Sequence, residues 1–429
     1  MISWKHTQAK FEEKKVITIG IVGGGAAGMA AALFAARKGA NVTIFEGNDR
    51  LGKKILSTGN GKCNLGNLNV DESRYYSSSP DKLKYYLNCF QPEDTLQFFR
   101  ELGLFIISKN GYLYPKSEQA ASVLDVLRYA IDRNPLIQVK VDCKIIKLEK
   151  NIRSSKIILW SAKERFTCDK IILACGSKAA PKTGSDGSGY DLAKYIGHTI
   201  IPVVPALVQL RCEEDWFKSV SGVRSEALIS VQNGSSILKE RGELQLTDYG
   251  ISGIPVFQLS RQINYLLKKA KSVEVTIDFF PDISLNELKD EVLTTRNKLS
   301  DYSTMEEFFS GLLNKKVMAA FIKLAGLRLN DSPGKVDINR ILRVCELCKC
   351  LKVHVNGSNS FDQAQVCAGG VSLDEMDRHL QSKLVEGVYI IGELLDVDGK
   401  CGGYNLHWAW CSGCIAGTSA ATNDEWSVK

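Results

Sequence analysis

The stretch that most constrains what this chain can fold into is residues 16–46. It begins with a short apolar run, residues 16–22, whose β-branched side chains are typical of a buried parallel strand. A glycine-rich turn follows, and then an alanine-rich segment, residues 29–37, which predicts a helix. A second apolar run at residues 41–45 predicts the next strand. The order strand, turn, helix, strand is that of a βαβ unit.

The turn carries three glycines at G-x-G-x-x-G spacing, namely Gly23, Gly25 and Gly28. In a βαβ unit the first allows a tight turn, the second lets a pyrophosphate approach the backbone, and the third lets helix and strand pack closely. The helix N-terminus offers free N–H groups and the positive end of its dipole to the phosphates. Glu46 follows the second strand, where a carboxylate can bind the adenosine ribose. The motif therefore predicts a dinucleotide site.

Composition limits the class of protein. The chain has 429 residues, enough for two or three domains, and a net charge of +7 that suits anionic ligands without indicating nucleic acid. Its 13 cysteines follow no small-domain pattern, and residues 1–15 contain no apolar stretch typical of a secretory signal. The apolar residues 16–36 fit the βαβ unit better than a membrane span. We therefore expect a cytoplasmic protein with a small-molecule substrate, and neither a membrane nor a nucleic acid as partner.

Further motifs at both ends of the chain fit the same kind of domain. The loop 47–64 is rich in glycine and lysine, so we expect it to lie along an extended anionic ligand. Residues 170–176 and 387–393 are apolar runs that lead into glycine, as central strands do where they face a ligand. A glycine pair at 402–403 precedes an apolar helix predicted at about residues 406–420. Because these motifs lie far apart in the chain, we expect a discontinuous nucleotide-binding domain.

The middle of the chain has a different character. Residues 80–102 predict two helices divided by Pro92, and a third helix is predicted from Ser117 to Arg133. From about residue 202, short β-like runs separated by turn residues indicate a small β-domain. Residues 284–330 read as helices before strand-like sequence resumes. We therefore expect one domain to be inserted into the other.

Taken together, these segments resemble the HI0933-like flavoprotein family, which includes proteins described as bile-acid reductases or aminoacetone oxidases. The motifs that carry the resemblance are residues 23–28, 53–64, 247–253, 364–371 and 392–410. The resemblance implies an α/β fold: an FAD-binding Rossmann-like domain of the two-dinucleotide-binding type, with an inserted β-barrel-like domain and a helical subdomain. The expected boundaries are 1–195 and 360–429 for the FAD-binding domain, 196–280 and 338–359 for the barrel, and 281–337 for the helical subdomain.

This chain departs from the family pattern at several positions. Asp248 stands where the family usually has His, and cysteines stand where Thr or Ser is commoner, at Cys367, Cys401, Cys411 and Cys414. We expect these changes to leave FAD binding intact. Cys411 and Cys414 fall within a predicted helix, so we interpret them as packing residues and not as a redox disulfide.

The residues expected to bind FAD lie in the glycine motifs and in the segments that the resemblance adds. They are Gly23, Gly25, Ala26, Ala27, Gly28, Glu46, Gly47, Lys53, Lys54, Thr58, Gly59, Asn60, Gly61, Asn64, Ala174, Cys175, Gly176, Gly392, Glu393, Asp396, Gly403, Tyr404, Asn405 and Leu406. The helix that begins near Tyr404 can face the flavin pyrimidine edge and stabilise the negative charge that collects there on reduction. We expect no metal, since the cysteines at 345, 348 and 350 lack a second C-x-x-C.

No proton donor stands out from the sequence. The candidates are Tyr404, Asp248, Lys400 and His407. We expect the substrate to lie between the flavin and the inserted domain, with the 247–253 and 400–404 loops at its edge. Because a second G-x-G-x-x-G is missing, either NAD(P)H acts as a transient electron donor without a Rossmann site of its own, or another donor reduces the flavin.

The resemblance implies an FAD-dependent oxidoreductase that reduces a carbon–carbon double bond conjugated to a ketone, as in 3-oxo-Δ4 or Δ4,6 bile acids. Two alternatives remain open at this point. One is an amine oxidase of the aminoacetone oxidase type, which releases hydrogen peroxide. The other is an FAD-containing protein that binds or modifies RNA, although the chain has no basic run with interleaved aromatic residues.

Overall fold

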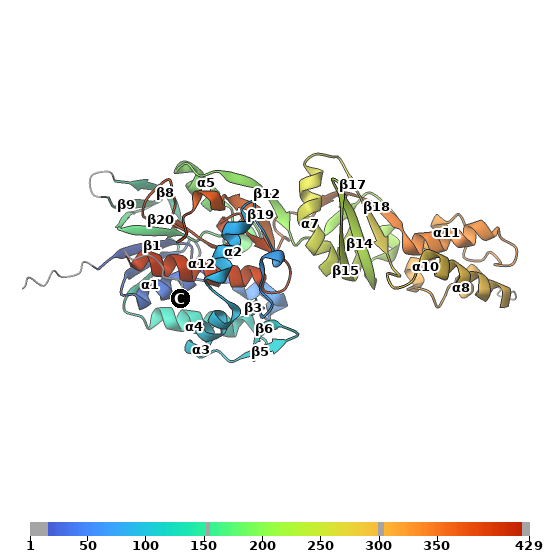
Figure 1. Ribbon diagram of the computed structural model, residues 1–429, viewed down its shortest axis with the longest axis horizontal. Helices are drawn as coiled ribbons and strands as arrows, with labels where there is room; N and C mark the ends of the chain where they lie inside the picture. The colour runs from blue at the N-terminus through green and yellow to red at the C-terminus, as the bar shows by residue number, and fades with distance from the viewer. Residues whose placement is uncertain (1–15, 152–154, 299–303, 423–429) are drawn as a thin grey trace, which may run out of the picture.

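The computed structural model describes residues 16–151, 155–298 and 304–422, so the expectation for residues 1–15 lies outside the described residues. The chain forms three parts in a row (Figure 1). At one end lies the Rossmann domain, which contains both ends of the described chain, followed by the inserted barrel (β13 to β18) and by the helical tip (α8 to α11). Across the described ranges, no helix combines the length and apolar character needed to cross a membrane.

A five-stranded parallel sheet forms the centre of the Rossmann domain, in the order β20-β11-β1-β2-β7. Its strands are β1 (Thr18–Val22), β2 (Asn41–Phe45), β7 (Ile137–Lys140), β11 (Lys170–Leu173) and β20 (Val388–Ile390). The central strands are almost wholly buried, as their β-branched sequences predict. Since β20 comes from near the C-terminus and the other four come from the first 173 residues, the sheet joins distant parts of the chain.

Two helices cover this sheet and pack unusually close to each other. Helix α1 (Ala26–Arg37) follows the glycine turn, and helix α12 (Tyr404–Ala421) is the buried apolar helix predicted near the C-terminus. A Cβ at Gly413 would lie 2.7 Å from the carbonyl oxygen of Ala27, and one at Gly417 would lie 2.4 Å from that of Ala31. Glycine on α12 therefore lets the two backbones touch, which holds both helix N-termini at the same edge of the sheet.

Smaller sheets and further helices complete the Rossmann domain. The sheets are β8-β9-β10 (Ile145–Lys150, Ile157–Ser161, Arg165–Cys168), β3-β6-β5 (Gly66–Asn67, Tyr112–Pro115, Ile106–Lys109), β12-β19 (Ile200–Ala206, Val366–Val371) and β4-β21 (Tyr75–Tyr76, Asp398–Gly399). The helices are α2 (Pro80–Asn88), α3 (Pro92–Glu101), α4 (Ala120–Asp132) and α5 (Ser188–Tyr195). Helix α3 begins at Pro92, which confirms the predicted division. Helix α4 begins at Ala120 and not at Ser117, because Glu118 adopts a positive φ of 52° and turns the chain first.

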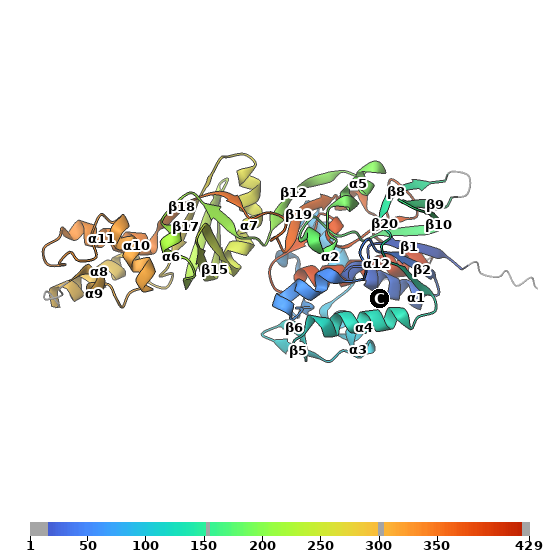
Figure 2. The same ribbon diagram turned by 180° about the vertical axis from the view of Figure 1, so that it is seen from behind.

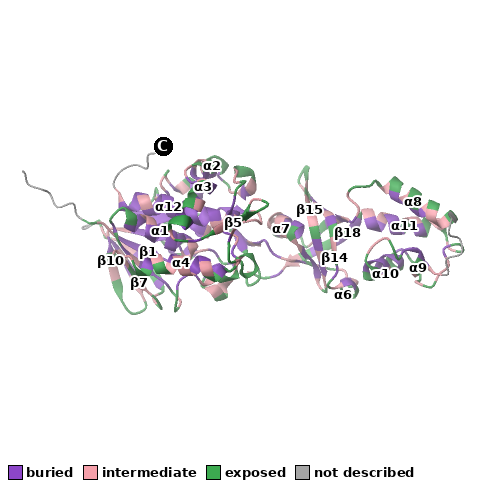
Figure 3. Cartoon of the chain, turned by 90° about the horizontal axis from the view of Figure 1, so that it is seen from below, coloured by how far each residue is buried: buried purple, intermediate pink, exposed green. Residues whose placement is uncertain are grey.

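The inserted barrel is closed and antiparallel, in the order β13-β16-β15-β14-β17-β18. Its strands are β13 (Leu210–Cys212), β14 (Arg224–Asn233), β15 (Ser236–Thr247), β16 (Gly250–Gly253), β17 (Val273–Asp278) and β18 (Leu351–Ser358), with helices α6 (Phe217–Val220) and α7 (Ile254–Leu267). These elements confirm the α/β fold with an inserted barrel. The barrel has a buried apolar core separate from that of the Rossmann domain (Figure 3).

The helical tip lies between β17 and β18 and consists of α8 (Leu285–Lys298), α9 (Met305–Phe308), α10 (Lys315–Leu324) and α11 (Ile338–Lys349). The expected boundary at residue 337 is too early, because Asp337 caps α11 by accepting a hydrogen bond from the N–H of Asn339. Seen from either side, the tip lies at the end of the molecule farthest from the Rossmann domain (Figures 1 and 2). Among the elements of the barrel, helix α7 lies on the side that faces the Rossmann domain.

Candidate cofactor and substrate site

The glycine turn has the geometry that a bound pyrophosphate requires. Gly23 has a φ of 105°, and a Cβ at Gly28 would lie 2.0 Å from the carbonyl oxygen of Gly23, so neither position accepts a side chain. A Cβ at Gly25 would meet no described atom within 4 Å. Gly25 is also the N-cap of α1, and no side chain of the described residues caps that helix. The helix therefore presents free N–H groups to open space, as an anion site does.

Glu46 is fixed by the same turn. Its carboxylate accepts hydrogen bonds from the N–H of Gly24 at 2.8 Å and from the N–H and Nδ2 of Asn48 at 2.8 and 2.7 Å. The residue is 8% exposed. Three acceptor positions are occupied, and a carboxylate has about four, so one remains for a ribose hydroxyl.

The lysine-rich loop crosses from Glu46 to the C-terminal motif. Its central part is the irregular 3₁₀ segment η1 (Lys53–Gly61), which turns through positive φ at Gly59, Asn60 and Gly61. Lys54 Nζ lies 2.6 Å from Glu393 Oε2, and that oxygen also accepts a hydrogen bond from Ser177 Oγ at 3.0 Å. The loop thus meets β11 and β20 at their carboxyl ends, where ligands bind in open α/β sheets.

The C-terminal motif adds a second helix N-terminus. Gly403 is the N-cap of α12 with a φ of 91°, and no described side chain caps the helix. The amide of Asn64 accepts from the N–H of Gly403 at 3.2 Å and donates to the carbonyl oxygens of Gly66 and Leu113. Asn405 holds the preceding loop by bonding both the N–H and the carbonyl oxygen of Gly399 at 2.8 Å. Both ends of one extended ligand are therefore offered backbone N–H groups.

Asp396 gives a further sign of a missing ligand. One of its carboxylate oxygens accepts from the N–H and Oγ of Ser78 at 2.8 and 2.6 Å. The other, Oδ1, is buried and has no partner among the described residues. An orphaned buried carboxylate oxygen is costly, so the position fits a hydroxyl donor such as a ribityl chain. With the two uncapped helix N-termini and the open space at Gly25, the residues present fit FAD.

The remaining residues predicted to bind the cofactor lie on these same segments or next to them. They are Ala26, Ala27, Gly47, Lys53, Thr58, Ala174, Cys175, Gly176, Gly392, Tyr404 and Leu406. Two of them have mainly structural surroundings: Cys175 Sγ donates to the carbonyl oxygen of Val22, and Leu406 packs against the core. Burial raises the pKa of the Cys175 thiol to about 12, so this cysteine stays protonated.

Two of the four candidate proton donors lie in unsuitable places. His407 is fully buried, with Thr95 Oγ1 3.1 Å from one ring nitrogen and the carbonyl oxygen of Phe90 3.1 Å from the other. Burial lowers the pKa of His407 to about 4, so it stays neutral. Asp248 lies in the exposed turn between β15 and β16, at the opposite end of β16 from α7. Neither position is suited to proton transfer at the cofactor.

The other two candidates lie beside the junction with the barrel. Lys400 Nζ is 3.0 Å from Glu240 Oε1 on β15, so this lysine ties the loop before α12 to the barrel. Tyr404 is the first residue of α12, and its ring contacts that of Tyr75 edge-on with centroids 5.7 Å apart. Burial raises the pKa of the Tyr404 phenol. The structure therefore brings Lys400 and Tyr404 together with the cofactor segments, but not Asp248.

A pair of residues that sequence reasoning missed lies at the same junction. Arg261 on α7 has its Nε 3.1 Å from Asp398 Oδ1 on β21, and their side chains are 14% and 4% exposed. Burial raises the pKa of Asp398 to about 7, and Arg261 opposes that rise. No local motif marks either residue, because the pair forms only when the barrel is folded against the Rossmann domain. Arg261 can be recognised only from the fold, which places it on the face of α7 that contacts the Rossmann domain.

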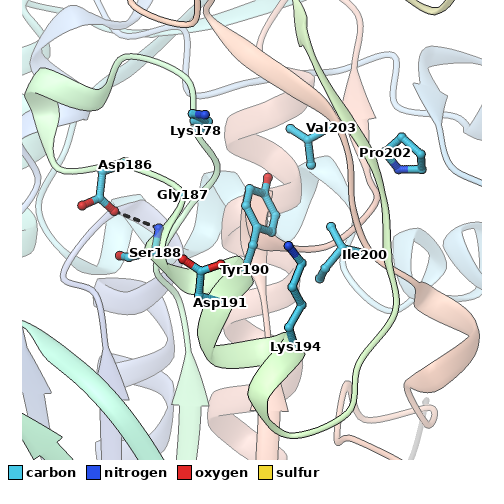
Figure 4. A pocket seen from close by; sticks show the side chains of 10 residues that line it. All are labelled: Lys178, Asp186, Gly187, Ser188, Tyr190, Asp191, Lys194, Ile200, Pro202 and Val203. Carbon is cyan, nitrogen blue, oxygen red and sulfur yellow. Dashed lines mark hydrogen bonds between the residues drawn. The ribbon is translucent and has the colours of Figure 1, made fainter. Parts of the chain in front are cut away.

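The cysteines and a cavity beside α5 lie apart from these residues. Cys411 is fully buried and donates to the carbonyl oxygen of Tyr86, and Cys414 is a free thiol whose pKa burial raises to about 12. A cavity of about 490 Å³ between α5 and β12 is lined by Lys178, Tyr190, Lys194 and their neighbours (Figure 4). None of the predicted cofactor or catalytic residues lines it, so we assign it no part in the reaction.

Comparison with known proteins places this arrangement in a family. The HI0933-like protein Rossmann domain matches residues 17–419. The chain is 43% identical over 408 residues to the 3-dehydro-bile acid delta(4,6)-reductase of Clostridium scindens. The matched region covers 94% of this chain and 98% of that relative. It is 29% identical over 397 residues to the ribosomal RNA dihydrouridine synthase of Haemophilus influenzae, covering 91% and 95%.

Among solved structures, one that is similar is a 3-ketosteroid-delta4-(5alpha)-dehydrogenase from Rhodococcus jostii RHA1. It is 15% identical with a TM-score of 0.45, covering 96% of this chain and 98% of that chain. The family match and the 43% identical relative cover nearly the whole chain, and the residues of the site fit the cofactor that the motifs predict. The chain belongs to the HI0933-like family and is an FAD-dependent oxidoreductase.

Proposed function

We propose that this protein reduces a carbon–carbon double bond conjugated to a ketone in a steroid-like small molecule, with a 3-oxo-Δ4 or Δ4,6 bile acid as the model substrate. The observation that carries this proposal is the 43% identity, over 98% of its length, to a relative named for reduction of such a substrate. We further propose that NAD(P)H is the electron donor and that it binds transiently, without a second Rossmann site.

In this proposal the chain's own residues have three tasks. The glycine turn, Glu46 and the N-termini of α1 and α12 hold the cofactor, which when bound supplies the hydride. The junction between the Rossmann domain and the barrel holds the substrate. Conjugate reduction places negative charge on the ketone oxygen, so the junction must also offer cationic or hydrogen-bonding groups to that oxygen.

Contacts across the junction support this location for the substrate. Besides the Lys400–Glu240 pair, the side chain of Gln258 on α7 accepts a hydrogen bond from the N–H of Cys401 at 3.1 Å. Both contacts hold the loop immediately before α12, where we place the flavin end of the cofactor. The barrel therefore supplies groups beside the expected flavin position, and ligand sites favour such domain interfaces.

A second candidate function is reduction of uracil in RNA. It is favoured by the 29% and 26% identity to ribosomal RNA dihydrouridine synthases of Haemophilus influenzae and Escherichia coli, over 91% of this chain in both cases. The chemistry is related, since the 5,6 double bond of uracil is also conjugated to a carbonyl group. The greater identity to the bile-acid reductase places the steroid-like substrate first.

The test is anaerobic spectroscopy of the purified, FAD-loaded protein. NADH and NADPH are first compared as reductants by the bleaching of the flavin absorbance. The reduced protein is then mixed with a 3-oxo-Δ4 steroid acid or with uridine-containing ribosomal RNA, and aminoacetone is mixed with the oxidised protein in air. We expect the steroid to reoxidise the flavin fastest. Faster reoxidation by RNA, or amine-dependent release of peroxide, would replace this proposal with the corresponding alternative.

A further inference from the structure

We propose that Arg261 binds the carbonyl oxygen of the substrate's conjugated ketone; this inference rests on the proposed function and names the group that receives the substrate. Arg261 lies on α7 of the inserted part of the chain, far in sequence from every glycine motif of the Rossmann domain. Its side chain reaches across the junction, and its contacts there have the character of a prepared binding group.

Arg261 is held rigidly from three sides. Its Nε lies 3.1 Å from Asp398 Oδ1, and its guanidinium lies 4.7 Å from the ring centroid of Tyr76 and 5.2 Å from that of Tyr265. Both rings are within the distance at which a guanidinium is attracted to an aromatic face. Tyr265 is itself fixed, because its hydroxyl donates to the carbonyl oxygen of Pro202. The plane of the guanidinium is therefore set before any ligand arrives.

The terminal nitrogens of Arg261 remain available. A guanidinium carries five N–H donors, and among the described residues Asp398 accepts only from Nε. Nη1 and Nη2 have no hydrogen-bond partner in the described chain, yet neither is sealed from solvent. The whole side chain is only 14% exposed. A half-enclosed cation with four unused donors is poised to receive an acceptor atom from a ligand.

The face of α7 that carries Arg261 is directed at the loop before α12. Gln258, Arg261 and Tyr265 recur at helical spacing and all three contact the Rossmann domain, at Cys401, Asp398 and Pro202 respectively. Asp398 and Cys401 bracket the short segment that leads to Gly403, the N-cap of α12. Arg261 thus lies beside the segment where we place the flavin.

The chemistry of the proposed reaction calls for such a group. The hydride adds to the β-carbon, the electron pair of the double bond moves toward the ketone oxygen, and a proton from water completes the α-carbon. NAD(P)H, as the donor, supplies these two electrons and is itself oxidised to NAD(P)⁺. The guanidinium of Arg261 offers N–H donors and positive charge, so it stabilises the charge on oxygen, and water supplies the proton. Fixed donors aimed at a developing oxyanion act without reorganising.

The experiment compares the FAD-loaded wild type with Arg261→Met and Arg261→Lys. The oxidised proteins are titrated with a phenolic steroid, whose phenolate imitates the charged oxygen but is not reduced, and binding is followed by the change in flavin absorbance. We expect Arg261→Met to bind the phenol about 10- to 100-fold more weakly and to reduce the enone about 100- to 1000-fold more slowly. Arg261→Lys should recover part of both, and bleaching by NAD(P)H should be unchanged.

Two controls keep the outcomes distinct. Arg241→Met removes another arginine of the barrel, which is paired on the exposed surface with Asp282 and Glu226, and should change nothing. If Arg261→Met does not fold because Asp398 is left unpaired, the double variant Arg261→Met/Asp398→Asn removes both charges and takes its place. A folded variant that binds the phenol and reduces the enone like wild type overturns the assignment. A wild type that binds the phenol through Arg261 but reduces no enone rejects the proposed function and leaves the binding role standing.

Discussion

The Rossmann domain and the inserted barrel build their halves of the site in opposite ways. In the Rossmann domain the groups that fit the cofactor are mostly backbone, at the glycine turn before α1 and at Gly403 before α12. In the barrel, the groups that contact the loop before α12 are side chains, from Gln258 and Arg261 on α7 and Glu240 on β15. Backbone sites demand glycine at fixed positions, so they are visible in a sequence. Side-chain sites demand only that the fold bring the right residue near, so they leave no such pattern in the sequence.

The largest effect that this contrast predicts is loss of FAD on replacing a single glycine of the Rossmann domain. In Gly25→Leu the new side chain enters the open space before α1, where the pyrophosphate has to lie, without striking any described atom at its Cβ. We expect a folded protein that retains no FAD after gel filtration, measured by absorbance at the flavin band. Gly311→Leu in the helical tip, where the Cβ is equally unobstructed, should stay fully loaded. Loss of FAD from both variants would argue against a specific requirement for glycine at position 25.

The second prediction contrasts a buried histidine of the Rossmann domain with an exposed one of the barrel. The unfolded pKa of histidine is about 6.5, and burial lowers that of His407 in the folded protein to about 4. The unfolded chain therefore takes up the proton first, and stability is lost as the pH falls from about 6.5 to about 4. The loss amounts to about 3 kcal/mol.

The dependence of the free energy of unfolding on pH, that is its slope, is measured by urea unfolding between pH 7 and pH 4.5. His407→Gln should flatten it, although the variant is less stable at pH 7. His354→Gln, which changes a histidine whose side chain is 48% exposed beside Glu214, is the matched substitution in the barrel with which the His407→Gln slope is compared. An unchanged slope in His407→Gln would contradict the neutral, buried state of this residue.

The third prediction concerns the contact between α1 and α12. Gly417→Ala places a Cβ 2.4 Å from the carbonyl oxygen of Ala31, so the two helices must move apart. We expect the free energy of unfolding to fall by about 1–3 kcal/mol, together with weaker FAD retention, because both N-termini shift. Gly311→Ala serves as the control in the helical tip. Equal stability of the two variants in thermal unfolding would argue against glycine-mediated packing.

The smallest effect is expected at the junction. Lys400→Met removes the bond between the loop before α12 and Glu240, and we expect turnover to fall by up to about tenfold while FAD content stays constant. Asp248→Ala, in the distant exposed turn of the barrel, should keep wild-type turnover. Steady-state kinetics, with the substrate found by the anaerobic test, would compare the turnover of the two variants. A larger loss of turnover in Asp248→Ala than in Lys400→Met would restore Asp248 as a catalytic candidate.

The accuracy of the sequence predictions follows the same division. The βαβ unit is confirmed, because periodicity and glycine spacing report on local backbone. The family, the FAD-dependent class and the inserted barrel, which the resemblance implied, are confirmed as well. The helix boundary at Ala120 was missed by three residues, since the positive φ of Glu118 is not typical of that residue type. Tertiary neighbours decide the rest: His407 falls within an apolar helix that is buried on all sides, and Arg261 gains its partner from β21.

The order of strands in the parallel sheet has a consequence for how the protein is made. Strand β20 and helix α12 come from the last tenth of the chain, yet they complete the sheet edge and the second half of the cofactor site. During synthesis the barrel has all its strands before that edge exists, and domains fold as units as they emerge. The nascent Rossmann half must wait, with one side of β11 unpaired, until β20 and α12 have been synthesised. FAD is therefore expected to be captured only after the inserted barrel has been made.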